Sequence, residues 1–192
     1  KANWERVKAE EGLSATDEHP ARYCLVELEN VHDEGIIFEP IHRVIFNVGD
    51  GALEWIKNKL AQQNGACEVH TFSSFDELKA ETAGKAGHII PFVSKQGVGC
   101  LHVAEPVAQL EVGTLQNALD ILIKETEGAT IDYIHGADVV NELGSKDGNM
   151  GFLLPSMDKA AFFPTVIFDG ALPRKTFSMG EAHEKRYYLE CR

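Results

Sequence analysis

The chain has 192 residues, of which 44% are hydrophobic and 25% charged, and its 30 acidic against 18 basic residues give a formal net charge of −12. This composition is typical of a globular protein that can build its own core. It argues against a nucleic-acid surface, which normally carries a broad positive field. No apolar run approaches the roughly 20 residues that span a bilayer, and no signal-peptide pattern opens the chain. We therefore predict a cytoplasmic protein that binds neither nucleic acids nor membranes.

The cysteines and histidines show none of the short spacings of a metal or redox site. The cysteines include no Cys-x-x-Cys pair, so we expect buried, reduced thiols at Cys24, Cys67, Cys100 and Cys191. Eight histidines are present, but no His-Glu-x-x-His or other short ligand spacing occurs. The sequence therefore predicts no metal site.

The chain opens with KANWERVKAEEG, a charged, helix-like segment without an initiating Met. We expect a carboxy-terminal fragment of a longer protein, in which residues 1–192 form a single α/β domain. Residues 22–30, RYCLVELEN, alternate apolar and polar positions as a strand does. Residues 36–48, IIFEPIHRVIFNV, form a second extended run. The two runs predict an antiparallel hairpin at the amino-terminal end.

A helix is expected next over residues 50–62, capped by Asp50, with Leu53, Ile56 and Leu60 on one face. Residues 67–72 then read as a strand. Ser74 and Glu77 have the spacing of a capping box for a short helix, which ends before a strand at residues 88–93. Residues 67–93 therefore predict a strand-helix-strand unit.

The second half of the chain repeats this alternation. Residues 88–93 and 98–103 predict a hairpin, and the apolar spacing over residues 115–123 predicts the clearest helix. Strand, helix and strand follow at residues 129–134, 137–143 and 150–154, with a last strand expected at residues 186–191. The predicted fold class is α/β, with a mixed sheet and helices packed on it.

Residues 172–189, LPRKTFSMGEAHEKRYYL, concentrate positive charge in an acidic chain. An arginine can grip an anion with two donors, a neighbouring lysine adds charge, and hydroxyls add further donors. We therefore predict an anion site whose binding residues include Arg174, Lys175 and Thr176. In the alternative interpretation, these and the basic residues Lys185 and Arg186 are solvated or paired with Glu181 and Glu184.

Two histidines are further candidates. His42 and Arg43 are neighbours on a predicted strand, so their side chains point to opposite faces, and Arg43 could instead pair with Glu39 or Glu27. His135 follows a predicted strand and precedes a helix, where loops of α/β sheets often meet ligands, although capping or packing would also explain it. The glycine-containing run 145–151 lacks the spacing of a phosphate loop or dinucleotide fingerprint and is expected to be a helix-to-strand turn.

Four motifs together resemble a known family, and they occur in that family's order: HPARYCLVELENVHDEGIIFEPIHRV, IDYIHGADVVNELG, GNMGFLLPSMDK and LPRKTFSMGEAHEKRYYLE. Over essentially its whole length, the chain resembles the carboxy-terminal two-thirds of the uncharacterised domain-of-unknown-function family ten-fifteen. Full-length members carry a Gly-Asn-His-Ser or Gly-His-His-Arg motif just upstream. That motif is similar to the phosphate-contacting one of the ParB and sulfiredoxin-like superfamily, which includes a free-serine kinase, and this sequence does not contain it.

Two elements carry over residue by residue: Pro40, His42 and Arg43, and Pro173 to Thr176. After Lys175 the sequence departs from the Pro-Arg-Lys-Ser-Thr form of many members. The resemblance implies part of a phosphoryl-transfer enzyme, a phosphotransferase or phosphatase when full length, acting on a small anionic metabolite such as serine or phosphoserine, or on a nucleotide. His42 would handle a proton, while Arg43, Arg174, Lys175, Thr176 and His135 would bind the anion. The alternative is a non-catalytic ligand-binding or structural domain that completes a site formed by the missing amino-terminal part.

Overall fold

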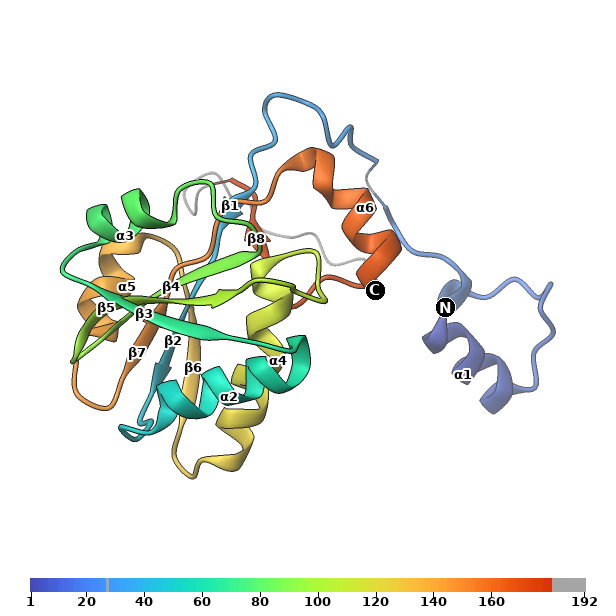
Figure 1. Cartoon of the computed structure of the whole chain (residues 1–192). Coiled ribbons are helices and arrows are strands. Elements are labelled where there is room, and N and C mark those ends of the chain that lie inside the picture. The colour runs from blue at the N-terminus through green and yellow to red at the C-terminus, as the bar shows by residue number, and fades with distance from the viewer. Residues whose placement is uncertain (27, 181–192) are drawn as a thin grey trace.

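The structure is a computed structural model that describes residues 1–26 and 28–180, and it confirms a mixed α/β fold (Figure 1). A six-stranded sheet has the strand order β3-β5-β4-β7-β2-β6, and a two-stranded sheet pairs β1 with β8. The strands are β1 (Glu39–Pro40), β2 (His42–Phe46), β3 (Glu68–Phe72), β4 (His88–Ser94), β5 (Gly97–Val103), β6 (Thr130–Ile134), β7 (Met150–Phe152) and β8 (Phe177–Ser178). The helices are α1 (Ala2–Glu11), α2 (Ala52–Asn64), α3 (Phe75–Thr82), α4 (Glu111–Glu125), α5 (Ala137–Gly144) and α6 (Lys159–Asp169), with a 3-10 turn at Pro20–Arg22.

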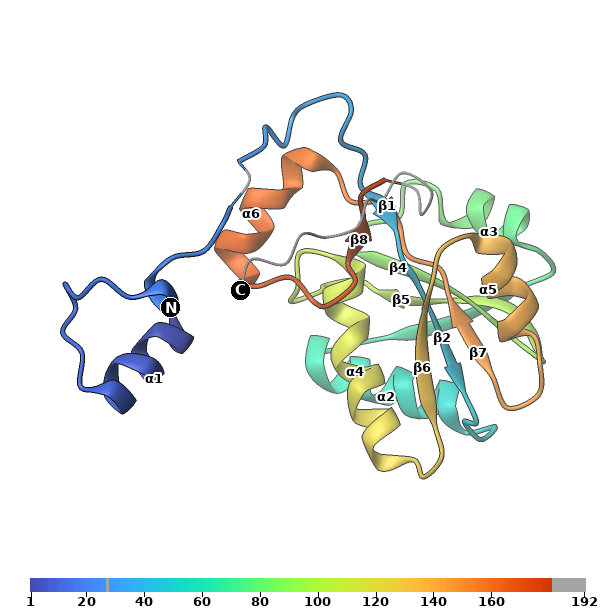
Figure 2. The ribbon, with the colours of Figure 1, turned by 180° about the vertical axis from the view of Figure 1, so that it is seen from behind.

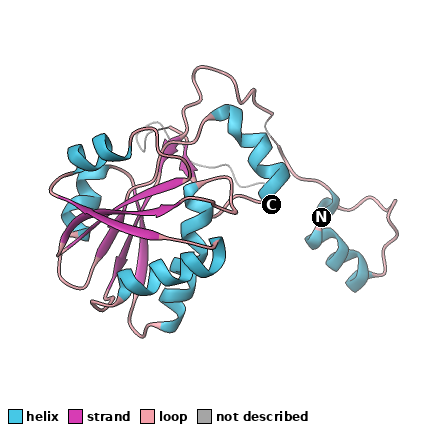
Figure 3. Cartoon of the chain, in the orientation of Figure 1, coloured by secondary structure: helices cyan, strands magenta, loops and turns pink. Residues whose placement is uncertain are grey.

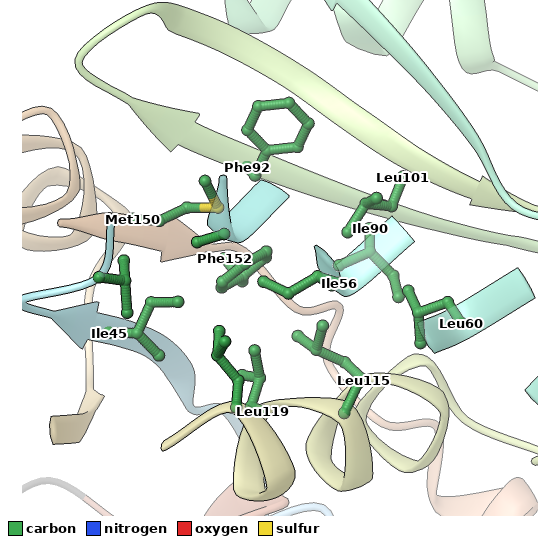
Figure 4. Packing of buried hydrophobic residues seen from close by; sticks show 14 of the residues in the cluster. Ile45, Ile56, Leu60, Ile90, Phe92, Leu101, Leu115, Leu119, Met150 and Phe152 are labelled. Atoms are coloured by element: carbon green, nitrogen blue, oxygen red, sulfur yellow. The ribbon is translucent and has the colours of Figure 1, made fainter. Parts of the chain in front are cut away.

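The main core lies between one face of the large sheet and helices α2 and α4 (Figure 4). Ile56 and Leu60 of α2 meet Leu115 and Leu119 of α4 over Phe152, and all five are fully buried. Burying a side chain of this size contributes about 1.5–3 kcal/mol. The apolar spacing over residues 115–123 thus correctly predicted the helix that covers the sheet.

Helices α3 and α5 cover the opposite face. Val140 of α5 packs with Val44 and Val93 in a second, smaller core. Close approach of α5 to the sheet requires glycine, because a Cβ on Gly144 would lie 2.6 Å from the backbone nitrogen of Gly151. The sheet is therefore the middle layer of three.

The sheet topology is antiparallel throughout the described pairings, in contrast to the mixed sheet that we expected. The two strand-helix-strand units do exist, as β3-α3-β4 and β6-α5-β7. However, β5 lies between the strands of the first unit, and β2 lies between those of the second. The two halves, β3-β5-β4 and β7-β2-β6, therefore mirror each other in order about the central β4–β7 pair, a relation that no sequence repeat indicates.

The predicted amino-terminal hairpin is wrong in its partners. Residues 22–26 and 28–30 form no strand, and the segment between α1 and the sheet is mostly loop (Figure 3). Instead, β1 pairs with β8, and β2 pairs with β6 and β7. The sequence does alternate there, but no described strand lies beside it to supply hydrogen bonds. Leu25 and Leu28 are therefore not packed against a sheet and are 81% and 98% exposed.

Helix α1 packs on the 3-10 turn, and both lie apart from the sheet in the two opposite views (Figures 1 and 2). Trp4 stacks with His19 there, and the Arg22 guanidinium lies 5.9 Å from the Trp4 ring centre. Cys24 follows this unit and is exposed, whereas Cys67 and Cys100 are buried as expected. The expectation of a buried thiol is therefore wrong at Cys24, while Cys191 lies outside the described residues.

One of the two predicted helix caps is present. Ser74 caps α3, and its Oγ accepts a hydrogen bond from the Glu77 backbone nitrogen at 3.2 Å. Asp50, in contrast, does not cap α2, which begins after Gly51. Residues 145–149 form the expected helix-to-strand turn between α5 and β7. Helix α6 was not predicted, and the last predicted strand, residues 186–191, lies outside the described residues.

Within the described part of the chain, no helix is long and apolar enough to cross a membrane.

Candidate anion-binding site

The Pro-Arg-Lys-Thr element forms a tight turn between α6 and β8. The Thr176 hydroxyl donates to the Pro173 carbonyl oxygen at 2.6 Å, and Lys175 adopts a left-handed backbone with φ of 56°. Arg174 and Lys175 are exposed, whereas Thr176 is 9% exposed. Since its single hydroxyl proton is used within the turn, Thr176 shapes the loop and has no donor left for an anion.

Arg43 supports this turn from inside the protein. It is fully buried on β2, where its Nε donates to Gln116 Oε1 at 2.8 Å and its Nη1 donates to the Ile41 carbonyl at 2.5 Å. Its Nη2 donates to the backbone carbonyl of Arg174 at 3.1 Å. Arg43 and the turn that carries Arg174 are therefore in direct contact. Arg43 itself is a positioning residue, because its donors are turned to the protein.

One carboxylate and one aromatic ring connect the two arginines. Asp120 Oδ1 on α4 accepts from Arg174 Nη2 and from Gln116 Nε2, both at 2.8 Å. The guanidinium carbons of Arg43 and Arg174 lie 4.7 and 5.7 Å from the centre of the Tyr133 ring. Such cation–π contacts contribute roughly 0.5–2 kcal/mol, with the larger values at desolvated sites.

The cluster keeps an excess of positive charge. Burial lowers the pKa of Arg43 to about 10, so its guanidinium is still protonated at neutral pH. The Asp120 charge and then the Tyr133 contact raise the pKa of Arg174. Arg174 alone is paired with the Asp120 carboxylate, Arg43 is bound to Gln116 and backbone carbonyls, and Lys175 follows Arg174 in the exposed turn.

His42 points to the other face of β2, as strand geometry requires. It is 6% exposed, and its Nδ1 accepts a hydrogen bond from the Leu154 backbone nitrogen at 3.0 Å. Burial lowers its pKa, and the nearby His135 and Arg43 lower it further. A neutral imidazole whose Nδ1 accepts a hydrogen bond carries its proton on Nε2, so its one lone pair is already in use. The predicted role of His42 as a base therefore requires that the hydrogen bond from Leu154 opens.

His135 follows β6 at the end of the sheet where β1 and β8 pair. Its Nε2 lies 2.9 Å from Glu39 Oε2, and its side chain is half exposed. An anion at His135 would have to compete with this carboxylate. The structure thus brings Arg43 and Arg174 into one network with Lys175 beside them, while His135 is paired with an acid.

A pocket of about 490 Å³ lies beside the network, between α4, α6 and the loop before Arg174. Pro173 and Asn117 line it; Arg174 directly follows Pro173, and Asp120 lies one helical turn after Asn117. Among the described lining residues Asp169 is the only charged one, so a phosphate group would be repelled from the interior of the pocket. Arg174 and Lys175 are not among the residues that line the pocket, although Arg174 directly follows one of them.

Sequence reasoning missed three members of the network: Gln116, Asp120 and Tyr133. Gln116 and Asp120 are four residues apart, so they share one face of α4 next to its apolar stripe. Tyr133 pairs directly with Arg43 in the β2–β6 register. A polar pair beside the apolar stripe was the one available signal, whereas the register could be known only from the fold.

The comparisons place the chain in a family. The family model described as "Protein of unknown function (DUF1015)" matches residues 1–122, which is more than half of the chain. The chain belongs to this family. The matched range includes His42, Arg43, Gln116 and Asp120, but it ends before the loop of Arg174 and Lys175. No curated protein and no solved structure matches the chain.

Proposed function

We propose that this chain provides the phosphate-binding part of a phosphoryl-transfer site for a small metabolite. The observation that carries the proposal is that a buried arginine, Arg43, holds the backbone of an exposed one, Arg174. A backbone fixed in this way lowers the conformational entropy that binding would cost at Arg174, whose side chain is also held by Asp120.

The charge and size of the neighbouring pocket support a small ligand. A phosphorylated amino acid such as phosphoserine would place its phosphate at Arg174 and Lys175 and its polar remainder near Asn117. A nucleotide is the other anion of this class. The net charge of −12 disfavours a long polyanion, and we propose a cytoplasmic setting without a nucleic-acid or membrane partner.

If the chain is part of an enzyme, His42 would handle a proton, as the resemblance of the Pro-x-His-Arg element to the family implies. Its lowered pKa keeps the imidazole neutral at neutral pH, and Nδ1 can accept a proton once the hydrogen bond from Leu154 opens. The alternative function is a non-catalytic ligand-binding or structural domain that completes a site formed elsewhere. It is favoured by the burial of His42 and by the bond that occupies its Nδ1.

Calorimetric titration with phosphoserine, serine and inorganic phosphate tests the binding proposal. Because a charge-assisted hydrogen bond contributes about 1.5–3 kcal/mol, Arg174→Ala should weaken phosphoserine binding roughly 10- to 100-fold. Lys95→Ala is the matched control, since Lys95 forms an equally short exposed pair with Asp147 at 2.8 Å. Equal affinities of Arg174→Ala and the wild type would refute the site.

A turnover assay separates the two functions. The full-length protein and its His42→Gln variant are incubated with phosphoserine, or with serine and a nucleotide, and phosphate transfer is followed. The enzymatic function is supported if the wild type shows turnover and His42→Gln reduces it while the affinity for phosphoserine is unchanged. Binding without turnover supports the alternative.

A further inference from the structure

The edge of the sheet farthest from β6 carries a second group of chemically competent side chains. Glu68 and His70 lie two residues apart on the edge strand β3, so both face the same side of the sheet. His102 on β5 is the direct register partner of Glu68. One ligand atom from each of the three residues lies within 4.8 Å of the other two.

This separation suits a single metal ion. Ligand atoms that bind zinc at about 2.0–2.2 Å in a tetrahedral arrangement are themselves about 3.3–3.6 Å apart. His70 Nε2 and Glu68 Oε2 are already 3.2 Å apart. The remaining separation, within the 4.8 Å of the group, can be closed by rotation of the exposed Glu68 side chain.

His102 is held by a carbonyl in the way that metal-binding histidines usually are. Its Nε2 lies 2.9 Å from the Ala86 carbonyl oxygen. Because a carbonyl can only accept, Nε2 carries the proton and Nδ1 keeps its lone pair. A backbone carbonyl that fixes the tautomer and the ring orientation is the common outer contact of histidine ligands.

We propose that Glu68, His70 and His102 bind one divalent transition-metal ion of the zinc type. Two imidazoles and one carboxylate prefer such ions to magnesium or calcium, which take oxygen ligands. Glu68 is exposed and both histidines are half-buried, so the ion can enter from solvent and a water can take the fourth position.

The site is independent of the proposed phosphate site. β3 and β6 form opposite edges of the six-stranded sheet, and Tyr133 of the arginine network lies on β6. Cys100, the register partner of His70, is fully buried, so water rather than this thiol is expected to complete the coordination. The failure of either proposal leaves the other intact.

Calorimetric titration of the untagged, EDTA-treated chain with zinc chloride tests the proposal. One ion per chain is expected to bind, and His70→Ala and His102→Ala should each weaken binding at least 10-fold. His19→Ala is the matched control, because His19 also lies near a carboxylate, Glu11 at 3.5 Å, but belongs to no three-ligand group among the described residues. It should bind zinc as the wild type does.

Cobalt provides a second readout. Cobalt chloride should give the visible absorption of a low-symmetry site in the wild type and in His19→Ala, and this absorption should be lost in His70→Ala and His102→Ala. Circular dichroism verifies that each variant is folded. The absence of stoichiometric zinc binding by the wild type would overturn the proposal. Unchanged binding by a folded His70→Ala/His102→Ala double variant would also overturn it.

Discussion

Arg43 and Arg174 belong to one hydrogen-bonded network, but they lie in different regions, the interior of β2 and the surface turn before β8. Arg43 directs its donors to Gln116 and to three backbone carbonyls, whereas Arg174 is exposed and its side chain donates to a single carboxylate. The same type of side chain thus positions the backbone in the interior, at Arg43, and is accessible to a ligand at the surface, at Arg174. A cationic sequence element therefore does not identify the binding residue until the burial of each cation is known.

Replacement of Arg43 should have the largest effect on the stability of the protein. In Arg43→Leu, the Gln116 side chain and the backbone carbonyls of Ile41 and Arg174 lose their donor. Each buried acceptor left without a partner costs about 1–3 kcal/mol, so we expect the free energy of unfolding to fall by about 3–5 kcal/mol. Urea denaturation followed by circular dichroism measures this loss.

Arg174→Ala is the matched comparison for this measurement, because it removes the same side-chain type at an exposed position. Its free energy of unfolding should change by only about 0.5 kcal/mol. Equal losses in Arg43→Leu and Arg174→Ala would contradict the division between a positioning and a binding arginine.

Arg43→Lys separates the charge of Arg43 from the directions of its hydrogen-bond donors. Lysine keeps the charge but cannot donate in the directions of the planar guanidinium, so one or two acceptors stay unpaired. We expect a loss of about 1–3 kcal/mol in the same urea experiment. Phosphoserine affinity should also fall, since the carbonyl of Arg174 is no longer held; unchanged affinity would show that the turn is rigid without Arg43.

Asp120→Asn should act in the opposite direction. The amide oxygen can still accept from Arg174 and Gln116, but the negative charge that opposes an incoming phosphate is gone. An exposed ion pair is worth about 0–1 kcal/mol, so phosphoserine affinity should rise up to about 5-fold. Calorimetry at two salt concentrations measures the change, and weaker binding would mean that the Asp120 charge positions Arg174 instead.

The smallest expected effect is a pH dependence of stability. Burial lowers the pKa of His42 and of His88 below 6.5 in the folded state. The unfolded chain therefore binds more protons in that range, and the free energy of unfolding should decrease as the pH falls below about 6.5. The decrease should be shallower in His42→Gln, whose amide can accept from Leu154. Urea denaturation between pH 7.5 and 5.5 tests this, and identical slopes would exclude a contribution of His42.

Sequence patterns predicted the elements that bury an apolar face on their own, and they failed where a partner decides. The stripe around Leu115 and Leu119 indicated α4 because helix periodicity is local. The alternation at Leu25 and Leu28 indicated a strand, yet strand formation requires a neighbour. Helix α6 was missed because Pro164 normally interrupts a helix.

The candidate site followed the same rule. The cations Arg174 and Lys175 could be identified from their density in an acidic chain. The burial of Arg43 and the part of Gln116 could not, because they depend on how α4 lies over β2. Likewise, Glu68 and His102 come together through strand register, which no linear ligand spacing in the sequence records.

The interleaved order of the large sheet also bears on how the chain folds. The strands β3, β4 and β5 are close in sequence, because a segment with α3 joins β3 to β4 and a turn at residues 95–96 joins β4 to β5, so their half can assemble through local contacts. β2 comes earlier, yet its partners β6 and β7 are made much later, and pairing them requires the closure of long loops. We expect hydrogen-exchange protection to appear first in β3–β5. Until β7 arrives, β2 and β4 present unpaired edges, which makes this interval the one in which the nascent chain is most open to edge-to-edge association.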